Sequence, residues 1–194
     1  NGYKSEFIIK TGLGYPRQKD GEVITGNEKL IDRFRGRVMF PIHNLSGRII
    51  AFGGRILKKD DKAAKYVNSP ESDIYFKSKS LYGIFFAKKA IVQKDNCYLV
   101  EGYTDVISLH QSGIENVVAS SGTSLTVEQI RLIGRYTKNI TVLYDGDAAG
   151  IKASLRGIDL ILEEGLNVKV ALFPDGDDPD SYSRKHGGGA TATF

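Results

Sequence analysis

The second half of the chain alternates short apolar runs with segments of helical period, and this alternation constrains the fold more than any other feature. Four runs are rich in Val, Ile, Leu or Tyr, and each is followed by Gly, Ser or Asp, which predicts strands. They are NCYLVEG, ENVVASS, NITVLYDG and NVKVALFPDG, beginning at residues 96, 115, 139 and 167. Strands that alternate with helices form a parallel sheet covered by helices, so we predict an α/β fold.

Three helices are predicted between these strands. The first is YTDVISLHQSG, and the second is TVEQIRLIGRY, in which Thr126 followed three residues later by Gln129 is a capping-box signature. The third runs from about residue 148 to 164 and ends at Gly165. Its period places one apolar face toward the core, made of Ile151, Leu155, Ile158 and either Ile161 or Leu162.

The first half of the chain is less regular. RVMFPIHN and RIIAFGGRIL predict a hairpin with Ser46 and Gly47 in its turn, and Pro41 indicates an edge strand or a bulge. KYVNSP predicts a short strand and SLYGIFFAKKAIVQKD a helix. We therefore expect a smaller mixed α+β subdomain over residues 1–95, the parallel sheet over residues 96–186, and a tail over residues 187–194.

Charge is divided between the same two halves. Residues 1–95 hold 19 Lys and Arg against 10 Asp and Glu, a net charge of +9, whereas residues 96–194 hold 8 against 13, a net charge of −5. A basic half attracts polyanions such as nucleic acid, and an acidic half concentrates cations. Chance segregation of solvated charges explains the same counts, so composition alone leaves both interpretations open.

Composition also excludes several classes of protein. A single cysteine, Cys97, rules out an internal disulfide framework, and with only three histidines we expect no zinc site. Cys97 lies beside the apolar run YLV and is expected to be a small buried strand residue. The chain has neither an apolar run long enough to cross a membrane nor a signal-like start, so we expect a cytoplasmic protein.

Acidic residues follow three of the four predicted strands. In a parallel sheet the carboxyl ends of all strands meet at one edge, where such folds place ligands. Clustered carboxylates repel one another unless a cation neutralises them, and oxygen ligands favour Mg²⁺ or Mn²⁺. The glycine after the first strand, Gly102, is expected to let the backbone turn sharply. The carboxylates are Glu101 with Asp105 one turn on, then Asp145 and Asp147, then Asp178 and Asp180.

Each carboxylate taken singly has a simpler explanation as a helix cap or turn residue. Convergence of three strand ends favours a metal site for Glu101, Asp145 and Asp147 as a group. Other site chemistries lack support, because GxxxxGK[ST], GxGxxG and GxSxG are all absent from the sequence. A metal site that performs phosphoryl transfer on a nucleic acid is the prediction that the residues favour.

At these residues the sequence resembles the Toprim domain, whose signature is a glutamate after one strand and Asp-x-Asp after a later one. LVEGYTDV and LYDGDAAG match it. The resemblance is closer to the bacterial DnaG-type DNA primase family, through RFRGRVMFPIHNLSGRIIAFGGRIL, KYVNSPESDIYFKSKSLYG, VASSGTSLT and FPDGDDPDSY, and it covers about residues 25–186. It implies a Toprim-type sheet and a nucleotidyltransferase that makes short RNA primers on single-stranded DNA.

The resemblance also implies roles for individual residues. Glu101, Asp145 and Asp147 would be catalytic and, with Asp105, Asp178 and Asp180, would bind two Mg²⁺ or Mn²⁺ ions. Cations on separate loops would face this acidic edge and hold ribonucleoside triphosphate and template. These nucleotide- and template-binding positions are Arg55, Lys65, Asn68 and Lys77.

The family has a zinc-binding domain and a helicase-binding domain that we do not find in this chain, so the resemblance implies a catalytic-core fragment that reaches the replicative helicase only through a domain absent here. Two other functions stay open. One is a different Toprim chemistry, that of a nuclease or topoisomerase, against which the FGGR and KYVNSP stretches argue. The other is a nucleic-acid-binding module in which the acidic edge is purely structural.

Overall fold

The computed structural model of the chain divides into two compact units. The first comprises Asn1–Ile42 and Arg48–Phe76, and the second comprises His43–Gly47 and Lys77–Phe194. The expected boundary between residues 95 and 96 stays a prediction about domain organisation. The structure describes residues 2–19, 22–23, 30–58, 63–122, 124–144, 148–172 and 181.

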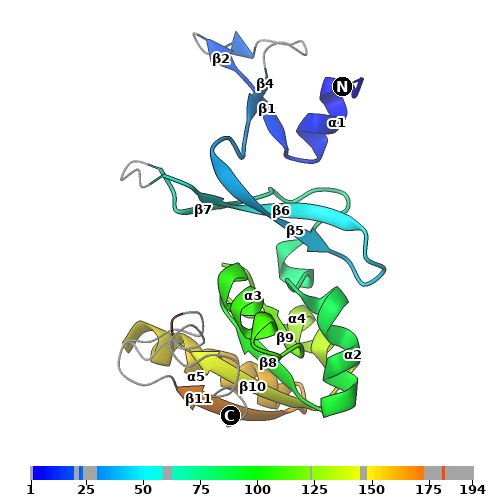
Figure 1. Ribbon diagram of the computed structural model, residues 1–194, viewed down its shortest axis with the longest axis vertical. Coiled ribbons are helices and arrows are strands. Elements are labelled where there is room, and N and C mark those ends of the chain that lie inside the picture. The colour runs from blue at the N-terminus through cyan, green and yellow to red at the C-terminus, as the bar shows by residue number, and fades with distance from the viewer. Residues whose placement is uncertain are drawn as a thin grey trace. The chain divides into compact units, whose positions relative to one another are not determined.

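In its described residues the first unit combines a short helix with small antiparallel sheets, as expected for a mixed α+β subdomain. Strand β1 pairs with β4, β2 pairs with β3, and β5, β6 and β7 form a three-stranded sheet in that order (Figure 1). Strand β5 is therefore an edge strand, which confirms the interpretation of Pro41. The elements are α1 (Ser5–Lys10), β1 (Gly14–Pro16), β2 (Gln18–Lys19), β3 (Glu22–Val23), β4 (Leu30–Asp32), β5 (Arg37–His43), β6 (Ile49–Ile56) and β7 (Tyr66–Asn68).

The turn between β5 and β6 is formed by the residues that the sequence indicated. The Asn44 Oδ1 atom accepts hydrogen bonds from the Ser46 amide at 3.0 Å and the Ser46 hydroxyl at 2.8 Å. Gly47 has a φ of +87°, in the left-handed region that glycine adopts without strain. This tip belongs to the second unit, where the Lys88 ammonium donates to the Leu45 carbonyl at 2.7 Å.

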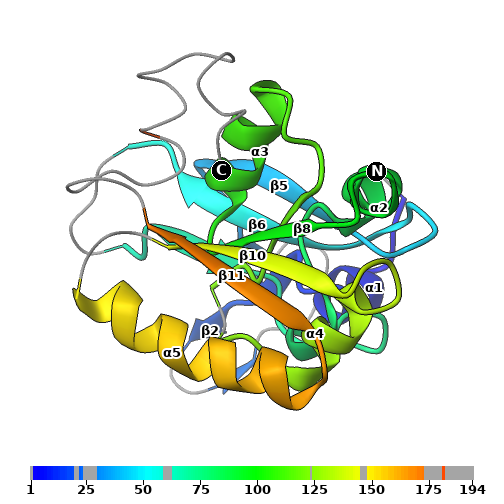
Figure 2. The same cartoon turned by 90° about the horizontal axis from the view of Figure 1, so that it is seen from below.

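The second unit is built on a four-stranded parallel sheet in the order β11-β10-β8-β9, of which Figure 2 shows β11, β10 and β8 side by side. All four predicted strands and all three predicted helices between them are present, and so is the helix predicted before the first strand, which confirms the α/β fold. The elements are η2 (Lys77–Lys79), α2 (Ile84–Lys94), β8 (Cys97–Val100), α3 (Tyr103–Gln111), β9 (Val117–Ala119), α4 (Val127–Ile133), β10 (Asn139–Tyr144), α5 (Ala148–Glu163) and β11 (Asn167–Leu172).

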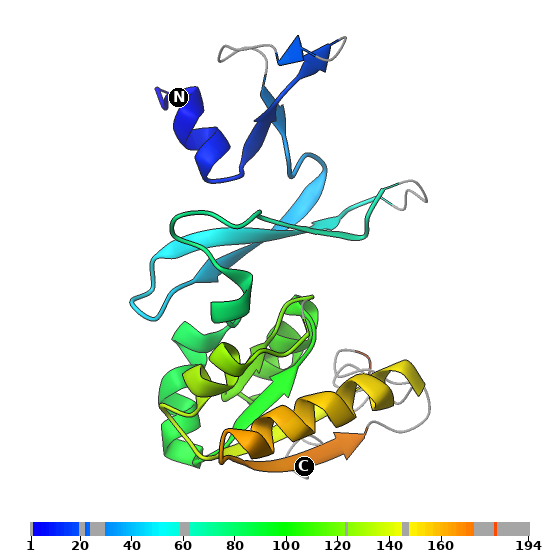
Figure 3. The ribbon, with the colours of Figure 1, turned by 180° about the vertical axis from the view of Figure 1, so that it is seen from behind.

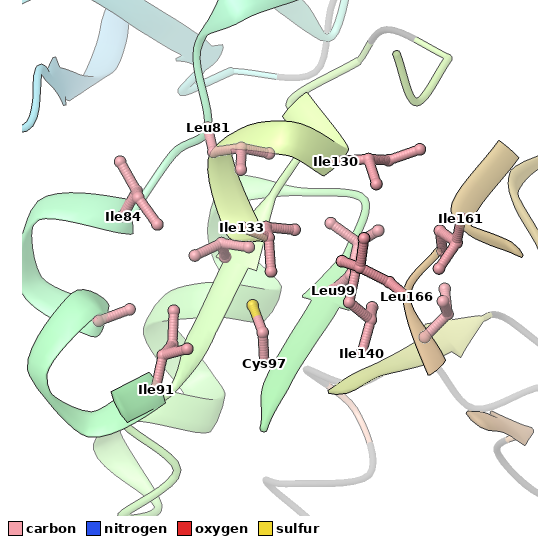
Figure 4. Close-up of a cluster of buried hydrophobic side chains, with 13 residues drawn as sticks. Leu81, Ile84, Ile91, Cys97, Leu99, Ile130, Ile133, Ile140, Ile161 and Leu166 are labelled. Carbon is pink, nitrogen blue, oxygen red and sulfur yellow. The ribbon is translucent and has the colours of Figure 1, made fainter. Parts of the chain in front are cut away.

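Successive side chains of a strand point to opposite faces of the sheet. Both faces of this sheet carry apolar residues, and helices cover both. On β8, Leu99 faces the cluster formed with α2, α4 and α5 (Figure 4), whereas Val100 faces a second cluster formed with α3. On α5 the structure resolves the alternative left open by the sequence. Ile161 has no exposed surface, and Leu162 is 54% exposed.

Helix α5 runs beside β11 (Figure 3), and its end is tied to α4 by an ion pair. The Arg131 Nε atom lies 2.8 Å from Glu164 Oε2, and Arg131 Nη2 lies 3.0 Å from Glu164 Oε1. This two-pronged hydrogen bond to the carboxylate raises the pKa of Arg131. The helix ends at Gly165 as the sequence predicted: Gly165 has a φ of +72°, and the Gly165 and Leu166 amides donate to the carbonyls of Leu162 at 3.0 Å and Ile161 at 3.2 Å.

Cys97 offers a direct test of this core. Its side chain is fully buried, its sulfur points into the cluster (Figure 4), and burial raises the pKa of the thiol. Because the reactive form is the thiolate, we expect the native protein at pH 8 to react with a disulfide reagent such as DTNB at least about tenfold more slowly than the protein unfolded in guanidinium. Equal rates in the two states would contradict the placement of Cys97.

Candidate active site

Glu101 follows the last residue of β8, at the carboxyl edge of the sheet. Its side chain is exposed, whereas the strand before it is largely buried. The Glu101 backbone carbonyl accepts a hydrogen bond from the Ser121 amide at 3.1 Å, and the Val100 carbonyl accepts one from the Ser120 amide at 3.3 Å. Backbone hydrogen bonds therefore link the segments that follow β8 and β9. The Glu101 side chain extends from a backbone that these bonds hold in place.

The turn that makes this contact has an unusual backbone. Ser121 has a φ of +59° and Gly122 a φ of +80°. The left-handed region costs a residue with a side chain about 1 kcal/mol. Ser121 is buried and gives its amide to Glu101, so the surrounding structure holds the strained conformation in place.

Asp105 is the third residue of α3 and caps the start of this helix. Its Oδ2 atom accepts a hydrogen bond from the Gly102 amide at 3.0 Å. A negative charge at this end also suits the helix dipole. The cap explanation that the sequence allowed for a single carboxylate therefore holds for Asp105, and the cap places this carboxylate against Gly102, the residue that follows Glu101.

Gly102 has a different role from the one expected. The chain bends at Glu101 and Gly102 as predicted, but the Gly102 φ of −114° and ψ of 164° are extended values that any residue adopts, so the bend does not depend on the conformational freedom of glycine. A Cβ atom at this position would lie 2.8 Å from Asp105 Oδ2. Glycine at this position leaves the capping carboxylate in place, whereas a larger residue would require it to shift.

The remaining predicted metal ligands lie outside the described residues: Asp145, Asp147, Asp178 and Asp180. In the part of the chain that the structure describes, no three His, Cys, Asp or Glu side chains are grouped closely enough to hold a metal ion. The strands that precede these residues are described. Strand β10 pairs with β8 with Val142 opposite Leu99, and it ends at Tyr144, so β8 and β10 end at the same edge.

Two predicted basic residues meet over one aromatic ring in the first unit. Arg55 pairs with Tyr66 across β6 and β7, and its Cζ atom lies 5.8 Å from the centre of the Tyr66 ring. The Lys65 ammonium lies 6.0 Å from the same centre. Cations are attracted to the face of a ring, and here the ring orients two of them together. The sequence prediction missed Tyr66, although the Lys-Tyr pair in KYVN was a usable signal.

The backbone under Lys65 is fixed by Arg37, which the sequence prediction also missed. One nitrogen of its guanidinium, Nη1, donates to the carbonyls of Gly54 at 3.2 Å, Ala64 at 2.9 Å and Lys65 at 3.3 Å. The Ile56 amide donates to the Lys65 carbonyl at 3.0 Å. Arg37 thus joins the segment that carries Lys65 to strand β6.

Asn68 and Lys77 complete the predicted basic and polar set. Asn68 ends β7 opposite Gly53, and Lys77 begins η2. Arg55 lies within a strand, so the expectation that the cations come from separate loops is wrong for it. Arg55, Lys65 and Asn68 belong to the first unit, whereas Lys77 and Glu101 belong to the second.

Comparison with known proteins identifies the family. Residues 5–88 match the model described as the DNA primase catalytic core, N-terminal domain, and residues 98–183 match the Toprim-like model. The chain belongs to the DnaG-type DNA primase family. It is 46% identical over 186 residues to a DNA primase of Clostridium acetobutylicum, covering 96% of this chain and 29% of that protein. It is 50% identical over 178 residues to a DNA primase of Halalkalibacterium halodurans, covering 92% and 28%.

A solved primase structure agrees with the fold. The structure of the DnaG primase catalytic domain bound to single-stranded DNA superposes with a TM-score of 0.82 at 40% identity, covering 97% of this chain and 56% of that one. The chain spans about three tenths of the length of the two curated primases above. Among the described helices, none is both long and apolar enough to cross a membrane.

The role of Arg37 can be measured without any ligand. Replacing Arg37 by Met removes the hydrogen bonds to Gly54, Ala64 and Lys65, so the Ile56 amide should exchange with solvent about fivefold faster or more. Hydrogen exchange of the intact chain measures this rate. Replacing the exposed neighbour Arg35 by Met is the matched control. Unchanged protection of Ile56 in the Arg37→Met variant would show that Arg37 does not hold this segment.

Proposed function

We propose that this chain carries the catalytic centre of a primase, which joins ribonucleotides into short RNA primers on a single-stranded DNA template. One observation carries the proposal most directly. Glu101 follows β8 at the edge where the neighbouring parallel strand β10 also ends, and the sequence after β10 reads Asp145-Gly146-Asp147. The primase family match supplies the chemistry to which this pattern belongs.

The proposed metal ligands are Glu101, Asp145 and Asp147, joined by Asp178 and Asp180. Their donor atoms are all carboxylate oxygens, which fits Mg²⁺ or Mn²⁺ and not zinc. Asp105 is assigned a supporting part, because one of its oxygens already caps α3. Two bound ions would lower the pKa of the primer 3′-hydroxyl and stabilise the charge on the departing pyrophosphate.

The basic residues are proposed to bind the phosphates. Arg55 and Lys65, oriented on the Tyr66 ring, present two positive charges from one sheet, and Lys77 presents another from η2. Asn68, at the end of β7, would add a polar contact to nucleotide or template. Single-stranded DNA as the template is supported by the similar DnaG domain that was solved with it. Binding to the replicative helicase stays a prediction, and we assign no residue of this chain to it.

The metal site is tested by neutralising Glu101. Replacing Glu101 by Gln removes one charge from the proposed ligand set while keeping its size, so we expect Mn²⁺ affinity to fall by more than about tenfold and template-directed ribonucleotide incorporation to be lost. Mn²⁺ binding is measured by electron paramagnetic resonance of the chain, independently of activity. Asp145→Asn should behave in the same way.

The control is Glu115→Gln, an exposed glutamate that precedes β9 at the opposite end of that strand. It should leave Mn²⁺ binding unchanged. If Glu101→Gln and Asp145→Asn bind Mn²⁺ like the unaltered chain, the acidic edge is structural and the nucleic-acid-binding alternative gains support.

The phosphate contacts are tested by salt. A lysine that neutralises one phosphate releases counterions on binding, so Lys65→Ala should reduce the magnitude of the slope of log affinity against log salt by about 0.7 for single-stranded DNA. Fluorescence anisotropy with a labelled oligonucleotide measures the slope. Lys138→Ala, which removes an exposed lysine just before β10, should leave it unchanged. An unchanged slope in Lys65→Ala would remove Lys65 from the interface.

A further inference from the structure

Gln129 is a buried polar residue with an unusual set of partners. It is the third residue of α4 and has no exposed surface. A buried amide is costly unless its donors and acceptor are paired. The Gln129 Oε1 atom accepts from the Thr126 amide at 3.2 Å, and Nε2 donates to the carbonyls of Lys77 at 3.1 Å and Ser80 at 2.8 Å. Only the first of these bonds belongs to a capping box.

Thr126 also makes a bond beyond its cap. Its hydroxyl accepts from the Gln129 amide at 3.2 Å, which completes the box, and donates to the Ser78 carbonyl at 2.6 Å. The two capping side chains therefore hold three carbonyls of the segment 77–80. These partners lie 48 to 52 residues away in the sequence.

The chemistry of the bonds explains why residue 129 is Gln. Glutamate would complete a capping box equally well, because the box needs only an acceptor at this position. Ionised glutamate has no hydrogen to give to the Lys77 and Ser80 carbonyls. The two donors of the Gln129 amide serve the segment 77–80, which the helix cap does not require.

The segment held in this way carries Lys77. Helix η2 is only three residues long, and a single turn of this kind has little stability of its own. Leu81, directly after the segment, is fully buried in the same cluster as Ile130 of α4 (Figure 4). The backbone of Lys77 is thus fixed by α4 through its carbonyl and by the core through Leu81.

We propose that Gln129 and Thr126 are positioning residues that set the backbone of Lys77 for nucleotide or template binding. The inference rests on the proposed function, in which Lys77 contacts a phosphate. It extends that function to two residues that touch no substrate. The start of α4 becomes part of the binding machinery, because the interactions that begin the helix also hold the lysine-bearing segment.

A double-mutant cycle on the intact chain tests the proposal, with a labelled single-stranded oligonucleotide and Mg-ATP as probes. Lys77→Ala should weaken the binding of at least one of the two probes. Gln129→Glu keeps the cap acceptor and removes both donors, so it should weaken the same probe about threefold to tenfold. In a chain that already carries Lys77→Ala, Gln129→Glu should cause no further loss of affinity, because the lysine side chain that Gln129 positions is absent.

The cycle distinguishes loss of Lys77 positioning from two other effects of Gln129→Glu, namely its added negative charge and a general destabilisation of the fold. A new negative charge at residue 129, or a loosened fold, would weaken binding by the same factor with or without Lys77. Thr126→Asp, which caps a helix but has no donor for the Ser78 carbonyl, should repeat the pattern, whereas Thr126→Ser should bind like the unaltered chain. If Gln129→Glu does not fold, Gln129→Met, neutral and of similar size, removes both donors together with the cap acceptor, and the cycle with Lys77→Ala separates positioning from the lost cap.

Each failure has a distinct meaning. If Lys77→Ala weakens neither probe, the proposed role of Lys77 is wrong and the inference is overturned with it. If Lys77→Ala weakens a probe but the loss from Gln129→Glu or Gln129→Met persists in full beside it, Lys77 keeps its proposed role and the positioning by Gln129 is overturned.

Discussion

The parallel pairing of β8 with its two neighbours is the constraint on which the second unit depends. Ile140 of β10 lies opposite Cys97, and Val117 of β9 lies opposite Tyr98, so the strands begin and end nearly level. Since a shift of one residue would exchange the two faces of a strand, the register also decides which side chains enter each core cluster. Glu101 owes its place at the edge to this pairing.

At the opposite, amino-terminal edge of the sheet, asparagine side chains link neighbouring strands. Each of the four strands begins at or directly after an asparagine, and several of these side chains bond to a neighbouring strand start. The Asn116 side-chain amide donates to the Asn96 backbone carbonyl at 2.8 Å, and the Asn167 side-chain amide donates to Asn139 Oδ1 at 2.9 Å. Asn139 also donates to the carboxylate of Asp95 at 3.1 Å. At this amino-terminal edge the carboxylate of Asp95 is held by neutral donors, from Asn139 and Thr137, whereas Glu101 at the carboxyl-terminal edge is exposed.

The starts of α3 and α4 combine a helix cap with a second role in the structure. Asp105 caps α3 beside Glu101, and Gln129 with Thr126 caps α4 while holding the segment that carries Lys77. A short carboxylate, amide or hydroxyl at the start of a helix sits at the surface of the sheet layer, close to the loops that leave the strands. For this reason a cap residue is well placed to fix a loop of the proposed primase site without additional structure.

The sequence by itself determined the secondary structure of the sheet, the capping box of α4 and the turn at Ser46 and Gly47, because periodicity, caps and turns depend on residues a few positions apart. It also determined the family, and it placed Glu101 at a strand end. Only the tertiary structure decided that Ile161 and not Leu162 is buried, since neighbouring positions on a helix differ by 100° and the pattern did not distinguish them. The same holds for Tyr66 beneath Arg55, for Arg37 beneath Lys65 and for the second role of Gln129. Arg37 and Gln129 reach partners 28 and 52 residues away, and Arg55 reaches Tyr66 only through the pairing of β6 with β7, so these contacts depend on how the chain folds.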